Sequence, residues 1–447
     1  MKRAFIFLAL LTLLPWLAFA QETVFDAHFA DSTLRLDYVF CGDAAHQEIY
    51  LRQALRTSAW AGRRTKLEKP LLQGNGQIRV LDPVSGKCLY ANSFSSLFQE
   101  WTTTGEAVSV PKAFECSLQV PWPKQAVNVE VTLLDTHGKV AAQLCHPVHP
   151  DDILIRPIAD NALPLRVIHG GGSPDKKIDI VIVSEGYTLA ETEKFFHDAE
   201  RAADALFSHE PFKGRAEDFS VRAVFAPSAD SGVSVPHRGD WRNTVVSSHF
   251  DTFYSERYLT VPDIWRVWDV IGTVPFEHVI VLANTPIYGG GGIYNSITIM
   301  NSDHPTFVPV LVHEFGHAFG GLGDEYFYDD PFAALYPADT EPWEPNLTTL
   351  VEFEAKWADM LPPGTPVPTP VDALEKQDVR PLWHTLRPKD KALLNRKVGV
   401  YEGGGYTSHG VYRPAQECRM KINECGDFCP VCERAIVKMI DYYTDNL

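Results

Sequence analysis

Methionine and long apolar runs are both scarce in this chain of 447 residues. It contains only five methionines, and no apolar run after the first twenty positions is long enough to span a bilayer. Basic residues are outnumbered as well, because 40 lysines and arginines face 57 aspartates and glutamates, for a formal net charge of −17. This acidic balance argues against nucleic acid or an anionic membrane as a partner. We therefore expect a soluble product without a membrane anchor.

Cysteine is missing from the whole middle of the chain. The cysteines form an early and a late group, namely Cys41, Cys88, Cys116 and Cys145, and then Cys418, Cys425, Cys429 and Cys432. In an exported chain, cysteines indicate disulfides before metal ligands, so we expect each group to pair within its own domain. The connectivity stays open. The spacing of Cys429-Pro430-Val431-Cys432 also fits a thioredoxin-like motif or a zinc knuckle.

The first twenty residues have the pattern of a secretory signal peptide. Lys2 and Arg3 form a positive start, an apolar stretch follows over Ala4–Leu17, and Ala18-Phe19-Ala20 is a small-x-small cleavage site. No cysteine directly follows the apolar stretch, which argues against a bacterial lipid anchor. We expect cleavage near Ala20 and a mature product that is secreted or periplasmic.

Residues 21 to 155 are predicted to form a β-sandwich. Apolar side chains alternate with others over Thr33–Phe40 and over Val127–Leu133, which is the period of a half-buried strand. Asp82-Pro83 and His137-Gly138 are typical turn residues. Nothing in this region has catalytic spacing, so we interpret it as a packing domain, with a substrate-positioning or carbohydrate-binding module as the alternative.

From about residue 156 to residue 447, the pattern changes to strands that alternate with helices. Ile178–Val183 and His278–Ala283 have the composition of buried strands, and Thr188–Glu191 is a capping box that opens a helix. Gly289–Gly292 is expected to be a flexible run before a strand over Ile293–Met300. We therefore expect a multidomain α+β or α/β protein, in which a β-sandwich precedes a mixed-sheet catalytic domain of the zincin type.

The sequence His313-Glu314-Phe315-Gly316-His317 carries the clearest chemical signal. Histidines four residues apart lie on one face of a helix, so both imidazoles can reach the same metal ion. Glu314 projects to one side and can contact a metal-bound water without binding the metal. Zinc lowers the pKa of such a water to about 7, and the glutamate can then accept its proton as the water attacks a carbonyl. We predict one catalytic Zn²⁺, with Glu314 as the general base.

A third protein ligand is expected just beyond the helix. Gly320 and Gly321 end the helix and permit a sharp turn, which would swing the next acidic residues back toward the metal. Asp324 is the first residue past this turn that can coordinate. The predicted ligands are thus His313, His317 and Asp324. The alternatives that stay open for the third position are Glu325, Glu352, Glu354 and His409.

The segment HEFGHAFGGLGDEY, which begins at His313, resembles the metzincin group of metallopeptidases. Gly320 matches the glycine of the metzincin signature, whereas the usual third-ligand position falls on Gly323, so the turn is one residue longer here. More specifically, the segment resembles the bacterial IgA-type metallopeptidases, and Val398–Met420 is similar to the same family. The resemblance covers about residues 177–447 and implies a metzincin-like zinc endopeptidase. It also implies a methionine in a tight turn beneath the zinc, for which Met420 is the candidate.

The leading hypothesis from the sequence is a secreted zinc-dependent endopeptidase that hydrolyses peptide bonds of proteins. Two alternatives stay open: an exported adhesin or binding protein on a metallopeptidase fold, and a zinc amidase that acts on glycan or cell-wall amides. The expected partner is a protein or peptide substrate, host and extracellular proteins included, with no nucleic acid. The resemblance does not by itself make immunoglobulin the substrate.

Overall fold

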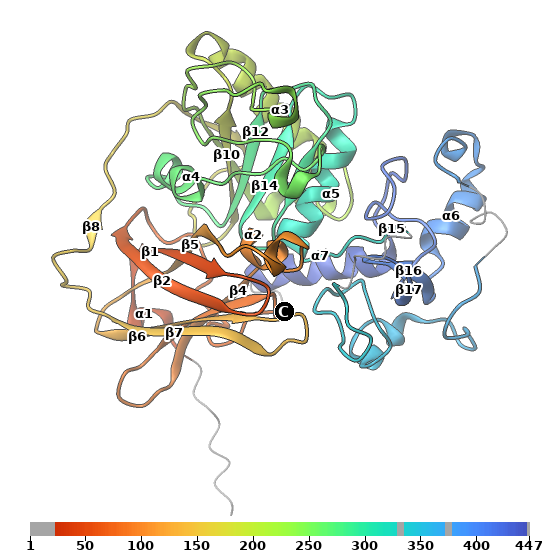
Figure 1. Cartoon of the computed structure of the whole chain (residues 1–447), viewed down its shortest axis with the longest axis horizontal. Helices are drawn as coiled ribbons and strands as arrows, with labels where there is room; N and C mark the ends of the chain where they lie inside the picture. The colour runs from red at the N-terminus through yellow and green to blue at the C-terminus, as the bar shows by residue number, and fades with distance from the viewer. Residues whose placement is uncertain (1–22, 329–334, 372–377, 445–447) are drawn as a thin grey trace, which may run out of the picture.

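The computed structural model describes residues 23–328, 335–371 and 378–444. The predicted signal peptide, with its cleavage site near Ala20, lies outside the described residues. Figure 1 shows a β-rich region, formed by the first part of the chain and coloured red to yellow, beside a larger mixed region formed by the rest. Among the described residues, no helix is both long and apolar enough to cross a membrane.

Two four-stranded sheets form the β-rich region. Their strand orders are β5-β1-β2-β8 and β4-β3-β6-β7, and neighbouring strands are antiparallel except for the short pairing of β2 with β8. One apolar core, drawn from residues between Phe25 and Val148, joins the two sheets. The elements are α1 Phe25–His28, β1 Phe29–Gly42, β2 Gln47–Arg56, β3 Gly76–Leu81, β4 Cys88–Phe94, α2 Leu97–Trp101, β5 Lys112–Pro123, β6 Val127–Leu134, β7 Val140–Val148 and β8 Arg156–Pro157.

Strand β1 is buried on both of its faces. The apolar set that the alternation predicted lies in the sandwich core, namely Leu34, Leu36, Tyr38 and Phe40. On the opposite face, Arg35 and Asp37 are also fully buried. Arg35 donates to both carboxylate oxygens of Asp37, at 2.7 and 2.9 Å, and to Asp269 of helix α4 (Ile264–Ile271) at 2.7 Å. The polar face of this strand is therefore covered by the second region of the chain.

A six-stranded mixed sheet forms the centre of the second region. Its order is β13-β14-β12-β10-β11-β9, in which β14, β12, β10 and β11 are parallel and the two edge strands pair antiparallel. The predicted strands over Ile178–Val183 and His278–Ala283 are confirmed as β10 and β12. The strands are β9 Leu165–His169, β10 Ile178–Glu185, β11 Phe219–Val224, β12 His278–Ala283, β13 Gly290–Gly292 and β14 Ile297–Asn301.

Helices cover both faces of this sheet. Helices α3 (Thr192–Phe207), α5 (Phe307–Gly320) and α7 (Pro430–Tyr443) share one apolar core with Ile180 and Ile182 of β10. Helix α4 belongs to a second core, which contains Val181 and Val183. Successive side chains of a strand point to opposite faces, so β10 separates the two cores. The predicted capping box at Thr188–Glu191 is present and leads through a short 3-10 turn into α3.

A small third sheet lies beside the main one, at the right of Figure 1. Its strands are ordered β15-β17-β16, with β15 at Phe327–Tyr328, β17 at Tyr406–Arg413 and β16 at Tyr401–Gly404. Helix α6 (Pro388–Arg396) lies in the same part of the molecule. The expected mixed α/β architecture with a β-rich N-terminal region is therefore present, whereas the domain boundary at residue 155 stays a prediction.

The glycine run Gly289–Gly292 is not the flexible segment that the sequence suggested. Gly290–Gly292 is the edge strand β13, and a turn at residues 293–296 follows it, so that β14 begins at Ile297 and the expected strand over Ile293–Met300 is too long at its start. A Cβ atom on Gly292 would lie 2.1 Å from the main-chain oxygen of Glu314 in α5. The glycines are therefore explained by close packing of a strand on a helix.

Candidate metal centre

Helix α5 carries the HEFGH motif, and the position of its first residue is compatible with the nearby prolines. Its first residue is Phe307 and Pro309 lies in the first turn, where a missing N–H costs no intrahelical hydrogen bond. The helix is apolar along most of its length, because it lies between the sheet and α7. It ends at Gly320, and Gly321 follows in the left-handed conformation (φ 62°) that favours glycine.

The two motif histidines are oriented by backbone carbonyls. Nδ1 of His313 lies 3.0 Å from the carbonyl oxygen of Arg419, and Nδ1 of His317 lies 2.5 Å from that of Leu322. A carbonyl only accepts, so each Nδ1 carries the hydrogen and each Nε2 presents a lone pair. The two Nε2 atoms face each other at 3.0 Å. Paired lone pairs at this distance repel unless a cation lies between them.

Asp324 completes a triangle of ligand atoms. The turn at Gly321 reverses the chain, and the Asn346 side chain holds both the N–H and the carbonyl of Gly323 at 2.7 and 2.9 Å. Oδ1 of Asp324 then lies 3.1 Å from Nε2 of His313 and 3.2 Å from Nε2 of His317. The other carboxylate oxygen accepts a hydrogen bond from the Tyr406 hydroxyl. The structure thus brings together the three residues that the sequence predicted as ligands.

The chemistry of this cluster fits a divalent cation. Asp324 is buried, and its Oδ1 accepts no hydrogen bond from the described residues. Atoms that share a tetrahedral zinc at about 2.0–2.1 Å lie about 3.3 Å apart, close to the observed triangle. Burial by itself lowers the pKa of His317, but the neighbouring Asp324 carboxylate raises it to about 9. The carboxylate of Asp324 thus favours a positive charge at this point, which a metal ion would supply.

Glu314 lies next to this triangle without joining it. Its side chain is half-buried and faces a cleft of about 900 Å³, which the two histidines and Asp324 also line. A Cβ atom on Gly290 would come within 3.3 Å of the Glu314 Cγ, so the glycine strand β13 forms the wall against which this side chain rests. Burial raises the pKa of Glu314 above its usual range, although the histidines oppose the shift.

The cleft includes side chains that sequence reasoning missed. Glu100, which follows the sandwich strand β4 in helix α2, faces the cleft and accepts a 2.6 Å hydrogen bond from the Tyr258 hydroxyl. Part of Glu100 is exposed to solvent, but desolvation of its carboxyl group in the cleft raises its pKa to about 7, and the Tyr258 hydroxyl opposes the shift. Arg257 and Tyr328 also line the cleft, and Arg257 donates to the Tyr328 hydroxyl at 2.9 Å. No local motif marks Glu100 or Tyr258, because they meet only after two distant segments have packed together.

The alternative third ligands lie elsewhere. Glu325 points away from the histidines, and its Oε1 lies 3.0 Å from Sγ of Cys432. Glu352 and Glu354 are exposed, and His409 is exposed with its Nδ1 3.4 Å from Glu402. Of the acidic candidates, Asp324 is the one whose oxygen lies within 3.2 Å of both histidine Nε2 atoms.

Met420 is packed directly against the metal-motif helix. It is fully buried, and a Cβ atom on Gly316 would lie 3.0 Å from its sulfur. Its carbonyl oxygen accepts a 2.9 Å hydrogen bond from the N–H of Glu325, and its neighbour Arg419 accepts from His313. The segment around Met420 therefore contacts both the motif helix and the first histidine, and the methionine turn beneath a zinc ion stays a prediction.

The structure joins none of the eight cysteines in a disulfide. The early four lie on separate strands of the sandwich, among them Cys116, which is buried, and Cys145, which is exposed. In the late group the sulfurs of Cys418 and Cys432 are 3.9 Å apart. The pairing of cysteines within each group stays a prediction.

A glycine strand along the cleft, a helix with converging histidines and a neighbouring carboxylate are the features of a metallopeptidase centre, and comparison with known families agrees. The chain matches IgA Peptidase M64 over residues 167–440 and Peptidase M64 N-terminus over residues 24–145. The first match covers more than half of the chain, so the protein belongs to the IgA Peptidase M64 family. It is a metallopeptidase, a hydrolase that acts on peptide bonds. No curated protein sequence matches the chain.

Proposed function

We propose that this metallopeptidase is an exported zinc-dependent endopeptidase, in which His313, His317 and Asp324 hold the ion and Glu314 is the general base. The observation that carries the proposal is the convergence of two Nε2 atoms and one orphaned carboxylate oxygen within 3.2 Å, directly beside Glu314. Membership of a peptidase family favours this activity over the adhesin and amidase alternatives.

Zinc suits the donor set better than the other common divalent ions. Two imidazole nitrogens and one carboxylate oxygen are typical of catalytic zinc sites, whereas magnesium and calcium prefer oxygen ligands alone. A bound zinc ion would act as a Lewis acid, lowering the pKa of a water and polarising the scissile carbonyl. Three protein ligands would leave one position for this chemistry.

Glu314 supplies the proton transfer in the proposed mechanism. Burial raises the pKa of Glu314 and so brings this pKa closer to neutral pH. A carboxylate with such a pKa can accept a proton from the attacking water and donate it to the leaving amine. Tyr406 and the two backbone carbonyls position the ligands, and none of these groups has to move a proton.

The open cleft supports action within a chain rather than at its end. Its lining includes Glu100, Tyr258, Gly290, Arg380 and Lys421, which come from segments far apart along the chain. A volume of about 900 Å³ is at the upper end of ordinary small-molecule sites and accommodates several residues of an extended peptide. We propose that residues 21–155 form the sandwich domain, residues 156–447 form the catalytic domain, and the sandwich contributes one wall through Glu100.

The export proposal rests on the pattern of the first twenty residues. N-terminal sequencing of the protein recovered outside the cytoplasm should begin near Gln21. An uncleaved N-terminus on an active protein would contradict this part of the proposal and leave the chemistry untouched.

Glu314→Gln tests the general base. We expect the variant to bind zinc as the wild type does and to lose on the order of 10²–10⁴-fold in turnover of a denatured protein, because the amide keeps the shape but accepts no proton. Asp324→Ala is the contrasting variant and should lose the catalytic zinc itself. Turnover close to that of the wild type by Glu314→Gln, at full metal occupancy, would remove Glu314 from the mechanism.

A further inference from the structure

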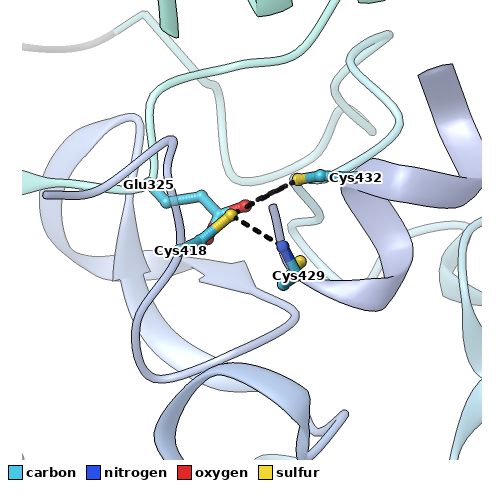
Figure 2. Close-up of side chains that lie close together, drawn as sticks. All are labelled: Glu325, Cys418, Cys429 and Cys432. Carbon is cyan, nitrogen blue, oxygen red and sulfur yellow. Dashed lines mark hydrogen bonds between the residues drawn. The ribbon is translucent and has the colours of Figure 1, made fainter. Parts of the chain in front are cut away.

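A second cluster of metal-ligating side chains lies behind the candidate catalytic centre. Glu325, Cys418, Cys429 and Cys432 are all buried, and each offers one ligand atom within 4.8 Å of the others. Figure 2 shows these four side chains converging from three segments: the turn after α5, the chain before Met420 and the start of α7. None of them faces the triangle of His313, His317 and Asp324.

The number of sulfurs in this cluster argues against a disulfide as its resting state. Three cysteines converge, so one disulfide would leave the third thiol buried beside a carboxylate. The fourth late cysteine, Cys425, lies apart: its sulfur contacts the carbonyl of Asp427 at 3.5 Å and the side-chain amide of Asn395 at 3.4 Å. A single cation, in contrast, uses all three sulfurs together with Glu325.

The distances suit a tetrahedral site. Sulfurs bound to one zinc at about 2.3 Å lie about 3.8 Å apart, and the sulfurs of Cys418 and Cys432 are 3.9 Å apart. Oε1 of Glu325 lies 3.0 Å from the Cys432 sulfur and also accepts from Asn346 at 3.0 Å. The other oxygen, Oε2, is buried and accepts no hydrogen bond from the described residues. An orphaned carboxylate oxygen among thiols is the environment that a metal ion satisfies.

The surroundings supply positive potential for such a site. Cys429 caps the N-terminus of α7, and Cys432 lies in the first turn of that 14-residue helix, where the helix dipole favours thiolates. The buried guanidinium of Arg413 interacts electrostatically with both Glu325 and Cys418. Three thiolates and one carboxylate around a divalent ion leave an excess of negative charge, which these two features reduce.

We propose that Glu325, Cys418, Cys429 and Cys432 bind a second, structural zinc ion. Four protein ligands close the coordination sphere, so this ion has no open position for water and no catalytic role. Softness and geometry select zinc over magnesium or calcium, because three of the four ligands are thiolates.

The proposed ion would tie together the segments that hold the catalytic cluster. Glu325 follows Asp324 directly, so consecutive side chains would serve two different ions. Cys418 lies beside Arg419, whose carbonyl orients His313, and close to Met420 beneath α5. A structural ion at this point therefore fixes the third catalytic ligand and the support of the first one relative to α7.

Cobalt substitution of the full-length protein tests the proposal. Cobalt bound to thiolates gives an intense charge-transfer band in the near ultraviolet, and cobalt bound to two histidines and an aspartate does not. We expect this band in the wild type and in His317→Ala, in which the catalytic site is damaged. The double variant Cys429→Ser/Cys432→Ser should lose the band, whereas the matched control Cys425→Ser should keep it. Zinc content should fall from about two ions per chain to about one in the double variant.

The wild-type and His317→Ala spectra decide the question even when the double variant does not fold. A wild type without the band, together with peptide mapping that links two of Cys418, Cys429 and Cys432 in a disulfide, would overturn the second site. Equal loss of the band in Cys425→Ser would overturn the ligand assignment. Because His317→Ala separates the two ions, a failure of the structural site is distinguishable from a failure of the proposed catalytic one.

Discussion

The hydroxyl of Tyr406 offers a sharp test of how the proposed zinc ligand Asp324 is held. Tyr406 donates the one hydrogen bond that the structure describes for Oδ2 of Asp324, and the carboxylate is buried. In Tyr406→Phe this oxygen loses its partner while the aromatic ring stays. A buried acceptor without a partner costs about 1–3 kcal/mol, which corresponds to about 5- to 150-fold in an equilibrium constant. Removing a group that orients a metal ligand typically costs about 10–100-fold in metal affinity.

We therefore expect Tyr406→Phe to require about 10–100-fold more free zinc for half-maximal activity. The assay restores activity to chelator-treated protein with buffered zinc. Tyr406→Phe and its control keep all four residues of the proposed structural site, so a difference between their zinc requirements reports the catalytic site. Tyr328→Phe is the matched control, because Tyr328 also lines the cleft but bonds to Arg257 and not to Asp324. An unchanged zinc requirement in Tyr406→Phe, or an equal shift in Tyr328→Phe, would refute the reasoning.

Two further predictions concern stability and pH. Gly292→Ala places a Cβ atom 2.1 Å from the carbonyl oxygen of Glu314. In denaturant titrations, this variant should lower the free energy of unfolding by at least about 1–3 kcal/mol. The control Gly105→Ala should change it by less than about 0.5 kcal/mol, because Gly105 has open space around it and a φ of −62°. Glu100 has a folded-state pKa of about 7, above its unfolded value of about 4.5, so the folded protein keeps a proton that the unfolded chain has lost. The thermal midpoint of metal-free protein should thus fall as pH rises from about 4.5 to about 7, and Glu100→Gln should flatten this slope; an unaltered slope would contradict the assignment.

The sequence predicted best those elements whose local pattern of residues agrees with their environment in the folded protein. Runs of four to eight residues were enough to predict the buried strands β10 and β12 and the capping box before α3. A strand that is buried on both faces is a continuous apolar run, and a capping box has a fixed residue spacing. Prediction from the sequence was weakest at Gly290–Gly292. Glycine permits both flexibility and close packing, and only the neighbouring helix decides between them.

The same distinction applies to the candidate site. His313, Glu314 and His317 lie on one helical turn, so their juxtaposition follows from helical spacing. Placing Asp324 beside the histidines required an assumption about the glycine turn, and the sequence assigned no role in the site to Tyr406 or Glu100. These two reach the cleft from the small sheet and from the sandwich, far away along the chain. Long-range contacts leave no periodic signal in a single sequence.

The contact between the sandwich and α4 bears on how the molecule is made. The fully buried core of the sandwich uses residues up to Val148, so the residues of this core all precede α4 and the zinc motif along the chain. Arg35 and Asp37 lie on the outer face of the sandwich, and Asp269 of α4 completes their ion-pair network. The wall of the cleft that carries Glu100 can therefore form before the catalytic residues do, and the later part of the chain can then fold against it.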